Sequence, residues 1–318
     1  MSGTKTDMLE GPLFKNLIMF AVPVMFTNML QLLFNTINTI VVGQFCGDNS
    51  LAAIGSTTSL INLLTNMFIG LSIGSNIMIA RYYGAKDRKA LQETVDNTML
   101  LAALSGIMLV IIGTTVTEPI LRLMNTPEEL ISLTALYLRI YFCAMPAIMV
   151  YNFGSAIMRG LGDTKRPLYY LMISGICNIM FNLIFITIFN MDVAGAGLAT
   201  VLSEYISAAF ILHALFEKND NYILRLKDIR PDAKVMTKIL AVGLPTGIQN
   251  SLFSFTNVLI QSSVNSFGAL AVAGCSAAGS IDAFIDAAML GISTAGMNFV
   301  SQNLGAKKYD RINKILIY

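Results

Sequence analysis

The sequence predicts an all-α, polytopic membrane protein built from two parallel six-helix repeats, the second of them incomplete. Three observations lead to this prediction. First, only 13% of the 318 residues are charged, about half the share in soluble domains, and 55% are hydrophobic. Second, long apolar segments recur along the chain with short loops between them. Third, two distant stretches of the chain are similar in sequence, which indicates an internal repeat.

Eight apolar segments are long enough to cross the hydrocarbon layer as α-helices, which takes about 20 residues each. They cover residues 14–42, 53–80, 92–116, 130–157, 168–189, 194–216, 236–265 and 270–301. Membrane-spanning β-strands are excluded because such a strand needs only about 10 residues of alternating pattern, and these apolar segments are much longer. Lysine and arginine gather in every second loop, so the positive-inside rule predicts that both termini lie in the cytoplasm.

The internal repeat has a period of six spans. The aligned positions include Gly70 with Gly291, Gly84-Ala85-Lys86 with Gly305-Ala306-Lys307, and Pro23 with Pro245. Because six is even, both copies have the same orientation across the membrane. The predicted organisation is a six-helix lobe at 1–216, a cytoplasmic linker at 217–235 and the first two helices of a second lobe at 236–318. We therefore expect a complete protein with twelve spans.

Polar side chains within the spans fall on single helix faces. They are Asn28, Gln31, Asn35 and Asn38 in the first span, Asn178 and Asn182 in the fifth, and Asn250, Asn257 and Gln261 in the seventh. Such amides either join helices or line a water-filled passage, and their recurrence at repeat-equivalent positions favours a passage. Pro23 and Pro245 are expected to bend their helices. The small-xxx-small pair Gly70 and Gly74 indicates close helix contact.

Three carboxylates lie near span centres, at Glu204, Asp282 and Asp286. Each costs on the order of 2.5–3.5 kcal/mol to insert. Asp282 and Asp286 are one helical turn apart and repel each other if both ionise. The pair could hold a proton, bind a cation between its carboxylates, or form structural hydrogen bonds as protonated acids. Glu204 could equally bond to a neighbouring helix.

Several other classes of function are excluded or disfavoured. The four cysteines are widely spaced, so neither a disulfide framework nor a metal site is expected. No basic patch with interleaved aromatics points to nucleic acid. The GxGD pattern of intramembrane aspartyl proteases occurs at 160–163, but basic neighbours place it in a loop. We therefore expect no enzyme, no cofactor and no obligate protein partner, while a purely structural role stays open for the chain taken alone.

Motifs along the whole chain resemble those of the multidrug and toxic compound extrusion (MATE) family of transporters. They are GPLFKNLIMFAVPVM, NTINTIVVGQF, LAAIGS with its repeat, ARYYGAKDRK, SQNLGAKKYDR, GSAIMRGLGDTKRPL and NMDVAGAGLATVLSEYISA. The resemblance implies two six-helix lobes arranged as a V around a central cavity in the bacterial cytoplasmic membrane. It also implies export of amphipathic, often cationic, organic compounds in exchange for Na⁺ or H⁺.

The chain departs from the family pattern at the first-lobe ion site. Many members have an acid where this chain has Asn38, and an Asp where it has Asn182. An amide can ligate Na⁺ but cannot carry a proton, so Glu204 or the pair Asp282/Asp286 is the better candidate for coupling. The alternative is a lipid-linked oligosaccharide flippase of the same superfamily. Such proteins tend to place several basic residues in the cavity, whereas Arg139 is the one candidate here, and it could instead snorkel to the interface.

Overall fold

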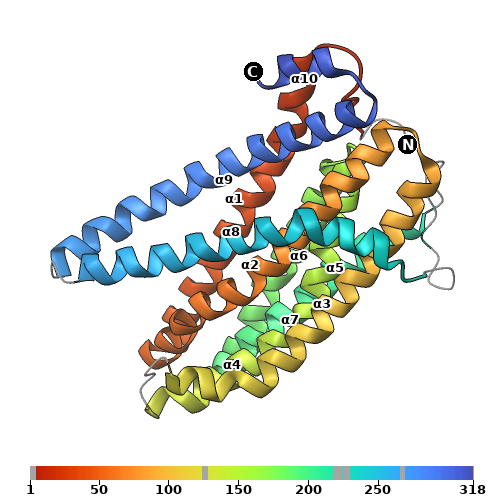
Figure 1. The fold of residues 1–318 in the computed structure, drawn as a ribbon. Helices are drawn as coiled ribbons and strands as arrows, with labels where there is room; N and C mark the ends of the chain where they lie inside the picture. The colour runs from red at the N-terminus through yellow and green to blue at the C-terminus, as the bar shows by residue number, and fades with distance from the viewer. Residues whose placement is uncertain (1–4, 124–127, 218–223, 225–229, 266–268, 318) are drawn as a thin grey trace.

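The computed structural model describes residues 5–123, 128–217, 224, 230–265 and 269–317, which form a bundle of long helices (Figure 1). The elements are α1 Leu13–Phe45, α2 Asp48–Gly84, α3 Arg88–Leu123, α4 Glu128–Phe142, α5 Met145–Gly160, α6 Lys165–Leu183, the π-helix η1 Ile184–Ile188, α7 Asp192–Phe216, α8 Ala233–Asn265, α9 Ala269–Gly305 and α10 Tyr309–Ile315. Within the described residues there is no strand, only an isolated bridge between Lys5 and Asp163. The all-α membrane fold is therefore confirmed.

Each predicted span coincides with helix, although two of them differ from the prediction. Span 130–157 is broken into α4 and α5, which are bent by 44° relative to each other. Pro146 lies in the first turn of α5, where a missing N–H costs nothing, and the Tyr205 hydroxyl donates to the Cys143 carbonyl at the break (3.3 Å). In the described residues six helices are long and apolar enough to cross a membrane, or seven with the bent pair. Helix α8 is not among them, because polar side chains lower its mean hydropathy.

The turns that follow α2 and α9 show the repeat in three dimensions. Lys86 and Lys307 have nearly the same left-handed backbone, with φ of 57° and 58°. Each turn closes with the same pattern, in which Asp87 N donates to Tyr82 O (3.1 Å) and Lys308 N donates to Asn303 O (2.9 Å). This is the hydrogen-bond pattern of a Schellman motif. The repeated Gly-Ala-Lys sequence therefore forms the same turn in both copies.

The helices meet at the end of the bundle that carries the basic loops. We call this the basic end, defined by the turns at 84–88, 160–165 and 305–309. On α9 the residues near this end are buried, with Phe299 and Asn303 at 0% exposure, whereas those further away are largely exposed. In Figure 1 the opposite ends of α8 and α9 project away from the α1–α2 connection. The two repeats are thus closed at the basic end and apart at the other.

Several helix contacts join the second repeat to the first, and two of them are crossings at repeat-equivalent positions. In one, Gly70 and Gly74 of α2 pack on Gly243 and Gly247 of α8, and a Cβ on Gly74 would lie 2.6 Å from the Gly243 nitrogen. The predicted close contact of Gly70 and Gly74 is therefore confirmed. In the other, Gly291 of α9 packs on α1. The aligned prolines Pro23 and Pro245 lie inside the continuous helices α1 and α8 at these crossings.

Candidate ion and substrate sites

A set of polar side chains links α6 to α7 in the middle of the first repeat. We call it the first-repeat polar cluster. It comprises Ser174, Asn178, Asn182 and Ser203, and we include Glu204 because it follows Ser203 in the chain. Ser174 Oγ donates to the Ser203 carbonyl (2.8 Å), and Asn178 Nδ2 donates to Ser203 Oγ (3.1 Å). Asn182 Nδ2 donates to both the main-chain and the side-chain oxygen of Asn178, each at 3.0 Å. The two predicted coupling amides of this span thus lie side by side.

Two amide oxygens near this cluster are buried without a donor. Asn182 is 1% exposed, and its Oδ1 has no hydrogen-bond partner among the described residues. The same holds for Oδ1 of Asn38 on α1. One turn before Asn38, the Phe34 ring packs on Gly175 of α6, so Asn38 follows on the face turned toward α6. Buried carbonyl oxygens without donors are the ligands that a hard cation such as Na⁺ prefers.

Glu204 supplies the carboxylate of the first-repeat polar cluster. It is partly buried in the middle of α7, and Ser207 Oγ approaches its Oε2 at 3.4 Å. The phenols of Tyr141 and Tyr151 lie within electrostatic range of this carboxylate. Of the acidic candidates, Glu204 is the one that directly follows Ser203, the residue to which Asn178 donates, and its own hydrogen-bond partner is Ser207 of the same helix.

Asp282 and Asp286 lie elsewhere, on α9 in the second repeat. Both side chains are exposed, and neither has an ion-pair partner among the described residues. They lie on the part of α9 that extends beyond the closed basic end. Within the described part of the chain no contact joins them to the first-repeat polar cluster. The candidates thus separate into two sites, one in each repeat.

The amides predicted to line a passage divide into different environments. Asn28 joins the repeats, because its Nδ2 donates to the Ala287 carbonyl of α9 (3.1 Å). Asn250 is partly buried. Gln31, Asn35 and Asn257 are exposed, and the side chain of Gln261 lies outside the described residues. The contact of Asn28 is of the helix-joining kind, which is the alternative to lining a passage.

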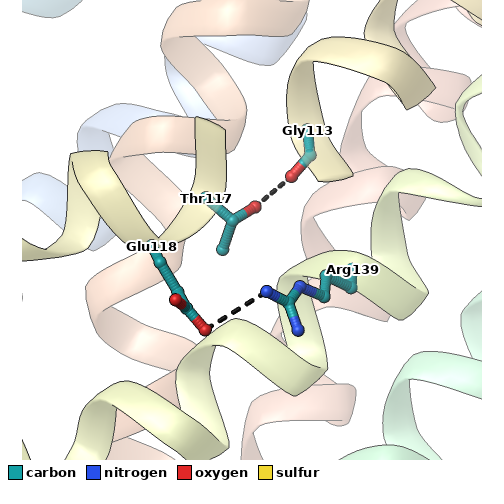
Figure 2. Close-up of polar contacts among 4 residues, drawn as sticks. All are labelled: Gly113, Thr117, Glu118 and Arg139. Atoms are coloured by element: carbon teal, nitrogen blue, oxygen red, sulfur yellow. Dashed lines mark hydrogen bonds and ion pairs between the residues drawn. The ribbon is translucent and has the colours of Figure 1, made fainter. Parts of the chain in front are cut away.

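Arg139 forms a pair that the sequence did not predict. Its Nη2 lies 3.2 Å from Glu118 Oε1 of α3, and both side chains are about half exposed (Figure 2). In the same view the Thr117 hydroxyl donates to the Gly113 carbonyl of its own helix. The other residue missed is Ser203, the link between α6 and α7. Its position one turn before Ser207 on α7 was the available signal.

Comparison with known proteins shows which family shares this architecture. The family model MatE matches residues 23–184 and 245–318. The probable multidrug resistance protein YoeA of Bacillus subtilis is 30% identical over 311 residues, covering 95% of this chain and 67% of the relative. YpnP of the same organism, also described as a probable multidrug resistance protein, is 29% identical and is covered over 68% of its length. The chain thus spans about two thirds of the length of these relatives.

Solved structures agree with the sequence comparison. A structure described as the outward-facing conformation of a multidrug resistance MATE family transporter has a TM-score of 0.91 and 26% identity, covering all of this chain and 71% of that one. A MATE structure in the bent conformation gives a TM-score of 0.90 and 26% identity, covering 98% of this chain and 70% of that one. The chain therefore belongs to the MatE family, whose members are membrane transporters and not enzymes.

Proposed function

We propose that the protein exports amphipathic, often cationic, organic compounds across the bacterial cytoplasmic membrane, driven by Na⁺ or H⁺ flowing inward. Its relatives bear the names of multidrug resistance and multidrug export proteins. The closed basic end and the separated opposite ends suit one state of a transporter that alternates access. The positive-inside rule puts the basic end in the cytoplasm, so this state opens outward.

The observation that carries the coupling proposal is the pair of buried amide oxygens of Asn38 and Asn182. Burying a carbonyl oxygen without a donor is unfavourable unless an ion or a water molecule supplies the missing contact. Na⁺ would supply it through direct coordination, with Asn178 and Ser203 close by. Glu204 would add a negative charge from the same cluster. Na⁺ is therefore the first choice of coupling ion at this site.

Asp282 and Asp286 are the second candidate for coupling. Their exposure on α9, away from the closed basic end, suits a site open to water, where either a proton or a cation could bind. Because the two carboxylates are one helical turn apart, they could hold one cation between them. Proton-driven export would favour this pair, since the amides of the first repeat cannot hold a proton.

Efflux of a cationic dye from proteoliposomes tests the function and separates the two sites. The reconstituted protein is given either a Na⁺ gradient or a proton gradient. We expect Asn38→Ala/Asn182→Ala to lower Na⁺-driven efflux about tenfold or more, because two ligands of the ion are lost. Asp282→Asn/Asp286→Asn should leave that rate nearly unchanged.

Proton-driven efflux that only the aspartate variant abolishes would move the coupling site to α9. Efflux that neither gradient drives in the parent protein would contradict the export proposal itself. Size-exclusion profiles of both variants serve as the control for correct folding and insertion.

A further inference from the structure

Residues 5–11, which precede α1, lie across the basic end and contact both repeats. We call them the strap. The strap has its own local order, because Asp7 Oδ1 accepts from the main-chain nitrogens of Leu9 (2.8 Å) and Glu10 (3.0 Å). Asn16 of α1 also donates to the carbonyls of Asp7 and Glu10 (2.8 and 3.0 Å). The strap is therefore a turn that is held by hydrogen bonds within itself and to α1, independently of its contacts with the second repeat.

The beginning of the strap is seated on the first repeat. Lys5 forms an antiparallel bridge with Asp163 in the turn between α5 and α6, and Thr6 N donates to the Gly162 carbonyl (2.9 Å). Gly162 has φ of 92°, and a Cβ there would lie 2.7 Å from the Thr6 carbonyl, so only glycine fits. Burial raises the pKa of the Asp163 carboxyl, an effect that Arg166 partly offsets.

The rest of the strap is held by the second repeat. Arg311 of α10 donates to the carbonyls of Met8 (3.3 Å), Glu10 (3.1 Å) and Gly11 (3.1 Å). Lys308 Nζ donates to the Leu9 carbonyl (2.9 Å), and Asn303 Nδ2 of α9 donates to that of Met8 (3.1 Å). All of these bonds end on main-chain oxygens, and several carry a formal charge, which makes them stronger than neutral ones.

The Met8 side chain adds an apolar contact at the same place. It is 1% exposed and belongs to a cluster of α1, α9 and α10 residues that includes Phe20, Phe299 and Ile315. Beside the strap, a cavity of about 490 Å³ reaches the turn after α2 at Tyr82 and Lys86. The strap is thus a seal between the repeats, next to a space through which water can reach it.

We propose that the strap is a latch that holds the basic end closed and must release α9 and α10 whenever the two repeats separate there. This inference rests on the proposed transport function, because alternating access requires such a separation. A short segment seated on the first repeat cannot follow the second repeat as it moves away. Releasing the side chains of Asn303, Lys308 and Arg311 is therefore part of opening to the cytoplasm.

The first test measures opening without measuring transport. In a background lacking the four native cysteines, the buried Ser301 of α9 is replaced by cysteine and labelled by a membrane-impermeant maleimide applied at the basic end. We expect Arg311→Ala to speed labelling about tenfold, because three charged hydrogen bonds to the closed state are lost. Arg311→Lys should fall between, since it keeps the charge but not the fork of donors.

The matched control is Lys314→Ala, one turn further along α10, whose side chain is exposed and makes no described contact with the strap. It should leave the labelling rate unchanged. Equal rates for Arg311→Ala and the parent would overturn the latch, and so would an equal increase in Lys314→Ala.

The second test locks the latch. Leu9→Cys/Lys308→Cys is joined by a short bifunctional thiol reagent, and dye efflux is measured before and after. We expect at least tenfold slower efflux that a reductant-cleavable reagent restores, while a monofunctional reagent on the same two cysteines has little effect. Undiminished efflux after joining would overturn the latch. Absence of efflux before joining would instead contradict the proposed export function, and the labelling result would still decide the latch.

Discussion

Two of the crossings between the repeats, α2–α8 and α1–α9, occupy equivalent positions but are built differently. At the α2–α8 crossing, Gly70 and Gly74 meet Gly243 and Gly247, so main chain touches main chain. In the repeat-related α1–α9 crossing, the equivalents of the two α8 glycines are Ala21 and Met25. Gly291 there faces the Met25 side chain, with the Met25 nitrogen at 2.9 Å from a Cβ position. The first crossing has no atoms that can give way, whereas the second has a flexible side chain.

The two repeats thus share the position of the helix crossing but differ in how well that crossing tolerates a larger side chain. Methionine has three rotatable side-chain bonds and adapts to irregular gaps, which glycine main chain cannot do. We therefore expect substitutions at equivalent glycines to have unequal costs. The following three predictions run from the largest expected effect to the smallest.

Gly74→Leu should be the most damaging of the three changes. A Cβ at this position would lie 2.6 Å from the nitrogen and 2.7 Å from the Cα of Gly243. Because the main chain of α2 or α8 must move, we expect the free energy of unfolding to fall by roughly 3 kcal/mol, or the two helices to fail to pack. Thermal unfolding in detergent, followed by size exclusion, measures it. Gly279→Leu on α9, which has no atom within 4 Å, is the matched control and should cost little.

Gly291→Ala should cost about 1 kcal/mol, and part of that cost should disappear in Met25→Ala. The added methyl overlaps the Met25 side chain, which the second substitution removes. A double-mutant cycle on the unfolding free energies measures the coupling, which we expect to be favourable by about 0.5 kcal/mol. A coupling near zero would mean that main chain limits this crossing as well, and the contrast with α2–α8 would be lost.

Asn28→Ala should have the smallest effect, about 0.6 kcal/mol, the average for a hydrogen bond between membrane helices. The variant loses the bond to the Ala287 carbonyl that ties α1 to α9. Gln31→Ala, at an exposed position one turn further on, should leave stability unchanged. A stability loss equal to that of Gly74→Leu would show that this amide, and not close packing, dominates the contact between the repeats.

Much of the fold was predictable because it depends on local patterns. Apolar length gave all eight helical segments, and the repeated Gly-Ala-Lys turn gave the relation between the two copies. The break between α4 and α5 was missed even though Pro146 marks the start of α5. An apolar segment with one proline reads equally as a single span, since proline is tolerated in membrane helices. The π-helix η1 has no comparable sequence signal.

The candidate site was only partly predictable. Residue spacing shows which face of a helix a side chain lies on, but it does not show which residue of another helix that side chain will contact. The spacing of Asn178 and Asn182 fixed their common face, and the structure places them together. Spacing could not show that Asn28 would bond to α9, or that Ser203 would join α6 to α7, since both depend on tertiary packing. The separation of Glu204 from Asp282 and Asp286, by contrast, was predictable, because the sequence repeat already assigned them to different copies.

The four-glycine crossing also has a thermodynamic consequence for a protein that works by cycling. Ordering a long side chain costs up to about 2 kcal/mol in lost rotamer freedom, whereas glycine has none to lose. At these four positions, separating and rejoining α2 and α8 therefore carries no side-chain entropy in either direction. Closing the strap, by contrast, immobilises Arg311 and Lys308 each time. Closing the basic end thus has an entropic cost at a few cationic side chains on the surface, a cost that the four glycines of the helix crossing do not add.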